Sequence, residues 1–426
     1  MSSRWKRRIS WAGALLIAAG GIASLSFCPA LGDSAGLARA EVLDATMPRT
    51  VVVGAPRGFA PSERVDPRRT GRTHTRLPSP AVEVWRRQIS GGIDLTPLVD
   101  TQGNVIVAQT IAEIIKLSPE GREIWRARTG TGAPTAPPVL TSDGTLVVLT
   151  AAGQAMGLTP SGATRFAVPL GFRRDADTTP LALDDGGVLI AARQALVEID
   201  ADGAVRARTT LGERAVGALL HGPEGALITT ESGAVYTWKA PGTPRKIGSF
   251  GGVPRRGALV ADARTLLAVV DGRSLVALDL PTGTTQVRAS APGLGVLFDA
   301  PATVNAAGLG LVATYGGMLI GVDASGSEKL TIALEKQALL LGADAGAPAA
   351  GFFGATELRP SPPVIVDPQG RIGFARGGGR VGVVTPEGNV GVVNERLCPS
   401  PIAVQPAGDR RMLVACRDGM IWMLGE

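Results

Sequence analysis

The stretch that decides the fold is LSPEGREIW, residues 117–125. Its leucine ends one apolar run, residues 118–121 have the composition of a tight turn, and residues 124–125 begin a second apolar run. Proline favours the second position of such a turn, and glycine favours its last. The stretch therefore predicts two antiparallel strands joined by a short turn.

The same turn recurs along the chain at a nearly constant interval. Seven copies are found, with the turn glycine at Gly121, Gly162, Gly203, Gly242, Gly283, Gly326 and Gly388. These glycines step by 41, 41, 39, 41, 43 and 62 residues, so the period is about 41 with one insertion of roughly 20. This interval is typical of the blades of a β-propeller.

Two further signals occur in phase with the turn. A proline followed by apolar residues begins an extended run at Pro97, Pro138, Pro180, Pro363 and Pro401. Proline is tolerated at the first residue of a strand. A glycine-containing turn and a second apolar run follow, as in residues 103–108 and 144–149. Each period therefore holds about four short strands, which is the content of one blade.

The chain ends inside an eighth copy of the repeat. Residues 420–424 match the strand before the turn in the other copies, and the chain stops at Glu426. Residues 82–87, VEVWRR, resemble the strand that follows the turn at residues 123–128. We therefore predict an all-β fold, an eight-bladed β-propeller whose N-terminal strand closes the last blade and so removes open sheet edges. A β-sandwich or a solenoid is the alternative.

The first 80 residues lack this repeat. Residues 1–40 combine an early cluster of Arg and Lys, an apolar run over residues 9–31 and small residues near Ala40, which is typical of a secretory signal peptide. The apolar run is long enough to span a bilayer, so a retained membrane anchor is one alternative. An acylated Cys28 is another, although the preceding Phe27 is larger than a lipobox favours. Residues 41–80 are rich in Arg and Pro without apolar periodicity, which predicts a disordered linker before the propeller of residues 81–426.

Most of the positive charge lies outside the predicted propeller. The whole chain has 43 Lys and Arg against 37 Asp and Glu, whereas residues 81–426 have 31 against 32. The predicted propeller is close to neutral, and this charge balance argues against nucleic acid as a partner.

One insertion interrupts the repeat between residues 334 and 362. It follows an outer strand, so we expect it on the face that carries the connections between blades. An apolar loop there predicts either a plug over the channel or a surface for a protein partner. Its candidate partner-binding residues are Leu339, Leu340, Leu341, Phe352 and Phe353.

Two cysteines remain once a signal peptide is removed. Cys398 precedes the first strand of the eighth blade, and Cys416 ends its second. Antiparallel neighbours bring these two points together, and an even number of cysteines suits an oxidising compartment. We predict a disulfide between Cys398 and Cys416 that fastens the closing blade, with two free buried thiols as the alternative.

No catalytic or metal-binding pattern is found in the repeats. His221 is the one histidine of residues 81–426, which leaves no material for a hydrolase triad or a histidine-rich metal site. The aspartates of residues 184–187 and 200–203 fit hairpin turns. We therefore predict no enzyme activity, no cofactor and no metal.

The repeats resemble the pyrroloquinoline-quinone-like β-propeller repeat family over about residues 81–426. The resemblance rests on the Pro-apolar starts, the Asp/Gly turns and the Gly-x-x-x-Trp spacing from Gly121 to Trp125. This family includes quinoprotein dehydrogenases and a propeller lipoprotein of the outer-membrane β-barrel assembly machine. The dehydrogenases have an adjacent pair of cysteines and a calcium site, for which this sequence has no matching positions. The resemblance is therefore nearer to the non-catalytic assembly subunit.

Together these observations predict an exported, monomeric and non-catalytic propeller, periplasmic or extracellular, that acts as a protein-interaction scaffold in the cell envelope. It would contact the membrane only through a retained N-terminal segment. A ligand-binding or quinone-dependent redox propeller is the alternative from another class. A third interpretation is a surface or matrix component tethered by the N-terminal segment.

Overall fold

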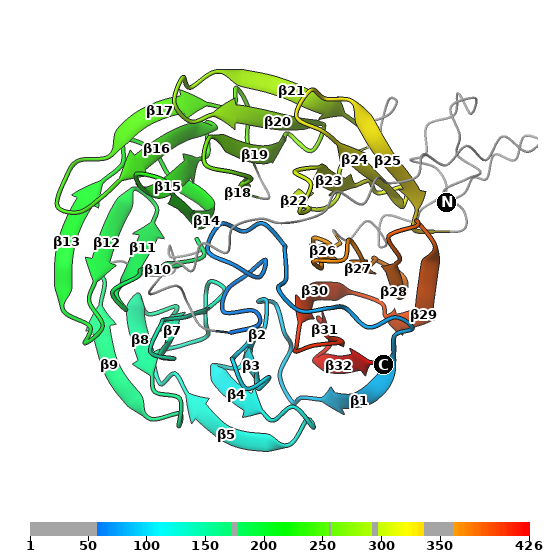
Figure 1. Cartoon of the computed structure of the whole chain (residues 1–426). Helices are drawn as coiled ribbons and strands as arrows, with labels where there is room; N and C mark the ends of the chain where they lie inside the picture. Colours follow the sequence, from blue (N-terminus) through cyan, green and yellow to red (C-terminus); the bar gives the residue numbers. More distant parts are fainter. Residues whose placement is uncertain (1–57, 172–177, 255–256, 292–296, 336–360) are drawn as a thin grey trace, which may run out of the picture. The chain divides into compact units, whose positions relative to one another are not determined.

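The computed structural model describes residues 58–171, 178–254, 257–291, 297–335 and 361–426. Within these ranges the chain forms eight four-stranded antiparallel sheets and no helix. The sheets are arranged in a ring (Figure 1), which confirms the predicted eight-bladed β-propeller. The predicted signal peptide of residues 1–40, and residues 41–57 of the predicted linker, lie outside the described residues.

Each blade is a meander of four strands, numbered here from the channel outward. Blade 1 consists of β2 (Leu98–Val99), β3 (Val105–Ala108), β4 (Glu113–Leu117) and β5 (Glu123–Arg128). Blade 2 consists of β6 (Val139–Leu140), β7 (Leu146–Leu149), β8 (Gln154–Leu158) and β9 (Thr164–Pro169). Blade 3 consists of β10 (Leu181–Ala182), β11 (Val188–Ala192), β12 (Ala195–Ile199) and β13 (Val205–Thr210). Blade 4 consists of β14 (Ala215–Gly222), β15 (Gly225–Thr230), β16 (Ala234–Trp238) and β17 (Arg245–Ser249).

The other half of the ring repeats this order. Blade 5 consists of β18 (Ala258–Val260), β19 (Thr265–Val270), β20 (Ser274–Asp279) and β21 (Thr285–Ser290). Blade 6 consists of β22 (Thr303–Val304), β23 (Gly310–Ala313), β24 (Met318–Val322) and β25 (Glu328–Ala333). Blade 7 consists of β26 (Ile365–Val366), β27 (Ile372–Ala375), β28 (Gly379–Val384) and β29 (Val390–Cys398). Blade 8 consists of β30 (Pro401–Pro406), β31 (Arg411–Cys416), β32 (Met420–Gly425) and, outermost, β1 (Val82–Gln88).

The predicted closure of the ring is confirmed in blade 8. Strand β1 pairs antiparallel with β32, with Arg86 opposite Trp422 and Arg87 opposite Ile421. In Figure 1 the blue β1 lies beside the red β32. The Arg86 guanidinium also lies 5.2 Å from the centre of the Trp422 ring, a distance that permits a cation–π contact. One blade therefore joins the two ends of the propeller.

The blades pack on one another through apolar side chains and through aromatic contacts at the turns. The Trp85 ring of blade 8 lies against Gly121 of blade 1, where a Cβ would stand 2.9 Å from the ring. Trp85 Nε1 donates a hydrogen bond to the carbonyl of Pro119, 2.7 Å away. Trp125 repeats this contact on the turn of blade 2, with Nε1 2.9 Å from the carbonyl of Pro160. The turn that reveals the repeat in the sequence is thus also a docking point between blades.

The alternating strand directions give the ring two different faces. We call the face with the turns after the first and third strands of each blade the turn face. We call the opposite face, where an outer strand connects to the next blade, the loop face. Ten residues separate β5 from β6, whereas 31 residues separate β25 from β26. The insertion therefore begins and ends on the loop face.

The disulfide joins two blades. Cys398 is the last residue of β29 in blade 7, and Cys416 is the last residue of β31 in blade 8. Their sulfurs are bonded, and their Cα atoms are 5.7 Å apart. The prediction of a bond within the last blade is therefore corrected, because Cys398 still belongs to the outer strand of the blade before.

Replacing both cysteines by alanine is expected to lower the free energy of unfolding by about 3 kcal/mol, because the bond closes a loop of 18 residues. Urea unfolding followed by circular dichroism measures the change. Both cysteines are buried, so the variant tests the bond better than a reductant does. Equal unfolding midpoints for the variant and the parent chain would contradict a stabilising role.

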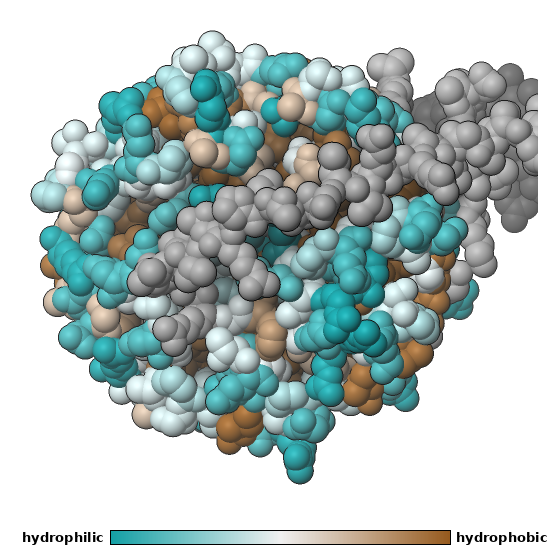
Figure 2. All heavy atoms as spheres, in the orientation of Figure 1, coloured by the Kyte–Doolittle hydropathy of each residue, from teal (hydrophilic) through white to brown (hydrophobic). Residues whose placement is uncertain are grey.

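On the face shown in Figure 2, hydrophilic residues predominate and hydrophobic ones form small separate patches. The exposed large apolar residues lie mainly on outer strands, for example Val82, Ile124 and Val287. Within the described ranges, no helix has the length and apolar character needed to cross a membrane.

Candidate functional site

The channel mouth at the turn face is closed by the chain itself. Residues 58–77, which we call the channel segment, run along the inner strands (blue in Figure 1), and their carbonyls accept hydrogen bonds from inner-strand N–H groups. The bonds are Val99 N to Ala60 O (2.9 Å), Leu140 N to Pro61 O (2.9 Å), His221 N to Pro67 O (3.0 Å), Val260 N to Arg68 O (2.9 Å), Val304 N to Thr70 O (3.0 Å) and Val366 N to Gly71 O (2.9 Å). Six blades are thus bound through the backbone.

The inner edges of the two remaining blades are bound through side chains, and the first turn of blade 8 adds a backbone hydrogen bond from Arg410 N to the carbonyl of Arg76, 2.7 Å away. Arg69 Nη2 donates to the carbonyl of Pro180 in front of β10, 2.9 Å away. Gln405 Nε2 of β30 donates to the carbonyl of Ser62, 3.4 Å away. The channel segment therefore contacts the inner edge of all eight blades. It provides partners for backbone groups that a sheet edge otherwise leaves unpaired.

Two buried arginines hold the segment at the axis. Arg64 is 4% exposed and donates from Nη1 to the carbonyl of Ala258, 3.1 Å away, and from Nη2 to that of Ala302. Burial lowers the pKa of Arg64 to about 10, so the side chain stays charged at neutral pH. Burial also lowers the pKa of Arg69, which is fully buried, while the nearby Glu63 opposes this shift. Carbonyl dipoles from several blades thus solvate two cations inside the ring.

The backbone between the arginines has an unusual conformation. Val65 has a φ of 76° and is buried. A β-branched residue adopts the left-handed region only where its surroundings impose it. The apolar contacts of Val65 with the core shared by blades 7 and 8 provide this constraint.

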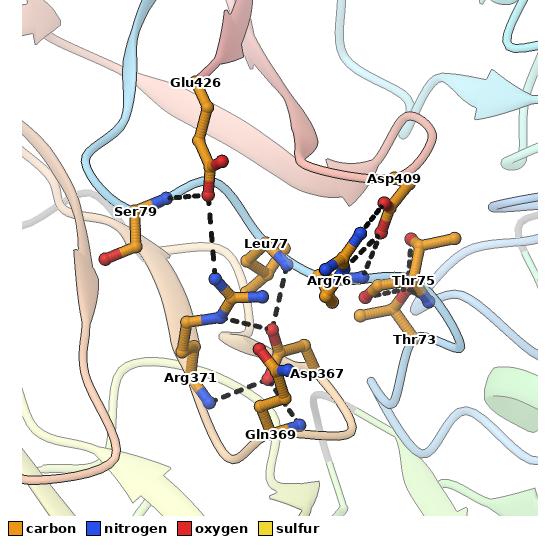
Figure 3. Close-up of polar contacts among 10 residues, drawn as sticks. All are labelled: Thr73, Thr75, Arg76, Leu77, Ser79, Asp367, Gln369, Arg371, Asp409 and Glu426. Carbon is orange, nitrogen blue, oxygen red and sulfur yellow. Dashed lines mark hydrogen bonds and ion pairs between the residues drawn. The ribbon is translucent and has the colours of Figure 1, made fainter.

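The end of the channel segment is fixed by a buried carboxylate. Asp367 follows β26, and its Oδ1 accepts hydrogen bonds from the N–H groups of Gln369 and Arg371, both 2.9 Å away. Its Oδ2 accepts one from Leu77 N at 2.9 Å and one from Arg371 Nε at 2.6 Å. Figure 3 shows this carboxylate between the hairpin of blade 7 and the channel segment. One side chain therefore shapes its own turn and anchors a segment 290 residues earlier.

Blade 8 provides a second anchor. Arg76 donates to Asp409 through its backbone N–H at 3.2 Å and through its Nε at 3.0 Å, and its Nη2 completes a two-pronged ion pair. The Arg76 side chain lowers the pKa of Asp409 to about 2. Two residues after the end of the segment, Ser79 N donates to Glu426 Oε1, 3.2 Å away (Figure 3).

This arrangement differs from the disordered linker that the composition predicts for residues 41–80. Residues 58–80 lie within the described structure, and Ala60, Arg64, Arg69 and Leu77 are buried. The reason is that the segment binds mainly through backbone carbonyls, which every residue carries. Proline at positions 61 and 67 fits because it accepts a bond and has no N–H that needs a partner. Contacts of this kind leave no pattern of side chains in the sequence from which they could be predicted.

On the loop face, a buried ion pair lies at the base of the insertion. Arg376 follows β27, and its Nη1 lies 2.8 Å from Oδ2 of Asp299, with the two side chains 3% and 1% exposed. Its Nε lies 3.3 Å from Glu335 Oε1, and its Nη2 donates to the carbonyl of Thr314 at 2.7 Å. Glu335 is the last described residue before the insertion. Arg376 therefore fixes the start of the insertion to both flanking blades.

The residues that the sequence singled out have different outcomes. The candidate partner-binding residues Leu339, Leu340, Leu341, Phe352 and Phe353 lie outside the described residues. His221 lies in β14, and its backbone N–H binds the channel segment. The part of the chain that the structure describes holds no cluster of three or more His, Cys, Asp or Glu suited to a metal ion.

Comparisons with known proteins identify the fold. No protein-family model matches the chain, and no curated protein matches its sequence. Among solved structures, the chain is similar to a quinohemoprotein alcohol dehydrogenase from Pseudomonas putida (10% identity, 86% of this chain and 80% of that chain, TM-score 0.60). It is also similar to the computationally designed protein Ika8 (13% identity, 80% and 98%, TM-score 0.59). A weaker likeness is to BamB from Moraxella catarrhalis (15% identity, 81% and 100%, TM-score 0.42).

The fold and the channel segment define the class of this protein as an eight-bladed β-propeller with one channel mouth closed by its own chain. Its structural neighbours include a quinohemoprotein dehydrogenase, as the resemblance in sequence implies. At these identities the likeness extends to the fold alone.

Proposed function

We propose that this protein is a non-catalytic scaffold that binds a protein partner through its loop face. The supporting observation is the buried network of Arg376, Asp299 and Glu335, which fixes the base of a long apolar insertion to two blades. A loop with a rigid base presents its side chains with less loss of conformational entropy on binding. Leu339, Leu340, Leu341, Phe352 and Phe353 are the proposed apolar anchors.

We further propose that the scaffold acts in the cell envelope after export. The disulfide between Cys398 and Cys416 supports this, because such bonds persist in oxidising compartments. The quinone-dependent alternative needs free space at the channel axis. The channel segment already takes up inner-strand hydrogen bonds at the turn-face mouth, so we favour the scaffold.

Exchanging the five anchors for serine is expected to reduce capture of the partner from envelope extracts at least tenfold, because desolvated apolar side chains usually dominate such interfaces. The measurement is affinity purification with quantitative mass spectrometry. A matched control exchanges Ile124 and Val205, which lie on outer strands and are 50% and 45% exposed, for serine.

The unfolding midpoint of each variant shows whether the ring is intact. Loss of the same captured protein in the anchor variant but not in the control supports the proposal. Equal capture by both variants, with both folded, would exclude the insertion as the binding surface.

A further inference from the structure

A pocket lies on the turn face between blades 5 and 6. Its volume is ≈ 570 Å³, within the range of about 300–1,000 Å³ that is usual for small-molecule sites. Its walls are the turn after β18 and the two turns of blade 6 at residues 305–308 and 323–325. Arg72 of the channel segment and Arg288 of β21 also line it.

The pocket occurs where a docking aromatic residue is missing. Trp85 and Trp125 reach the turn of the following blade at the first two junctions of the ring. At the junction of blades 5 and 6, Gln286 takes this role, and its Nε2 donates to the carbonyl of Ser325, 3.4 Å away. An amide is smaller than an indole ring, so space remains between the two blades.

The two arginines of the pocket have unused hydrogen-bond donors. Neither side chain makes a hydrogen bond or a close ion pair within the described ranges, and Arg288 Nε is buried without a partner. A guanidinium has five N–H donors, and burying one without a partner costs free energy. Burial also lowers the pKa of Arg288, which Asp262 and Asp323 only partly oppose.

The two acidic residues of the pocket are already engaged in turns. Asp323 Oδ1 accepts hydrogen bonds from the backbone N–H groups of Ser325 at 2.8 Å and Ser327 at 3.0 Å. Asp262 Oδ1 accepts them from those of Arg264 at 2.7 Å and Thr265 at 2.8 Å. One oxygen of each carboxylate is thus committed to its hairpin, and Asp323 Oδ2 lies 3.4 Å from Lys329 Nζ, whereas the guanidinium donors are open to a ligand.

We propose that this pocket binds a small organic molecule with a single carboxylate group, held by Arg72 and Arg288. Guanidinium and carboxylate match in planar, two-pronged geometry. Two arginines and two aspartates line the pocket, so the charges balance and a polyanion gains little. Four alanines also line the pocket and accommodate a short apolar chain: Ala261, Ala306, Ala307 and Ala324. This site is separate from the loop face and is independent of the proposed scaffold function.

Saturation-transfer NMR with butyrate tests the proposal on the full-length protein, with the neutral butyramide as the matched ligand. Butyrate is expected to receive saturation, and butyramide is not. The affinity for butyrate is expected to fall at least tenfold in Arg288→Gln and in Arg72→Gln. Arg245→Gln, an exposed arginine of β17 that pairs with Glu224, serves as the control and is expected to bind like the parent chain.

A second variant keeps the test decisive if an arginine variant does not fold. Ala306→Trp places a ring in the pocket from an exposed turn of blade 6, without removing either arginine, and is expected to abolish butyrate binding. Equal saturation of butyrate and butyramide would overturn the proposal. Unchanged butyrate affinity in folded Arg288→Gln and Ala306→Trp would also overturn it.

Discussion

A chain that begins at residue 79 is expected to lose most of its stability, whereas a chain that begins at residue 58 is expected to keep it. The difference between the two is the channel segment, which accepts backbone hydrogen bonds from six inner strands. At about 1 kcal/mol for each bond, the loss is about 6 kcal/mol. This is comparable with the total stability of a folded domain, about 5–15 kcal/mol. Urea unfolding of both truncated chains measures the difference.

The truncation has a built-in control, because both chains retain β1 and hence the closure of blade 8. A synthetic peptide of residues 58–78, added to the shorter chain, is expected to raise its unfolding midpoint in a concentration-dependent way. A peptide with Arg64 and Arg69 replaced by glutamine is the matched control and is expected to bind more weakly. Equal midpoints for the two truncated chains would show that the segment does not stabilise the ring.

The ring itself was predictable because the same turn residues recur once in each blade. The spacing of Gly121, Gly162 and Gly203 reports the length of a blade, and each glycine allows an approach that a Cβ would block, as at Trp85 against Gly121. The closure was predictable from an incomplete last copy and an orphan strand at the start. Each of these signals can be recognised within a short stretch of sequence, so the prediction did not require knowledge of contacts between distant residues.

The channel segment was not predictable, because its contacts connect parts of the chain that share no pattern. Leu77 N binds a carboxylate of Asp367, 290 residues away. In the sequence, Asp367 resembles any other hairpin aspartate, since its Oδ1 caps the turn before Arg371 in the usual way. Only the hydrogen bond that its Oδ2 accepts from Leu77 N distinguishes Asp367 from the other hairpin aspartates. The same composition of arginine and proline indicates disorder in solution and suits a segment that accepts hydrogen bonds inside a ring.

The pocket between blades 5 and 6 has a signal that sequence reasoning did not use. Trp125 pairs with Lys116 and docks on the next blade, and in the copy at Gly283 the residue in the same place, opposite Ala277, is Gln286. At this junction the smaller side chain leaves room beside the turn of blade 6. Departures from a repeat therefore indicate candidate binding sites, although the unpartnered state of Arg288 becomes visible only in the structure.

Replacing Asp299 by leucine is expected to destabilise the propeller by about 3–5 kcal/mol, because it removes the buried carboxylate beside Arg376 and leaves only the partly exposed Glu335 to balance that charge. The cost arises from desolvation of the guanidinium more than from the lost attraction. Glu224→Leu is the matched control, since it breaks an ion pair with Arg245 whose side chains are 65% and 74% exposed. Exposed pairs of this kind contribute about 0–1 kcal/mol. Urea unfolding of the two variants gives the comparison.

The double variant Asp299→Leu with Arg376→Met tests whether the destabilisation comes from the unpaired charge or from lost packing. An apolar pair of similar volume avoids the unpaired charge, so the double variant is expected to be more stable than Asp299→Leu alone. It also removes the contact of Arg376 with Glu335 at the start of the insertion. If that contact orients the insertion for a partner, the double variant is expected to regain stability but to capture less of the partner than the parent chain does. Equal, small effects of Asp299→Leu and Glu224→Leu would contradict a buried, charge-dependent anchor at this base.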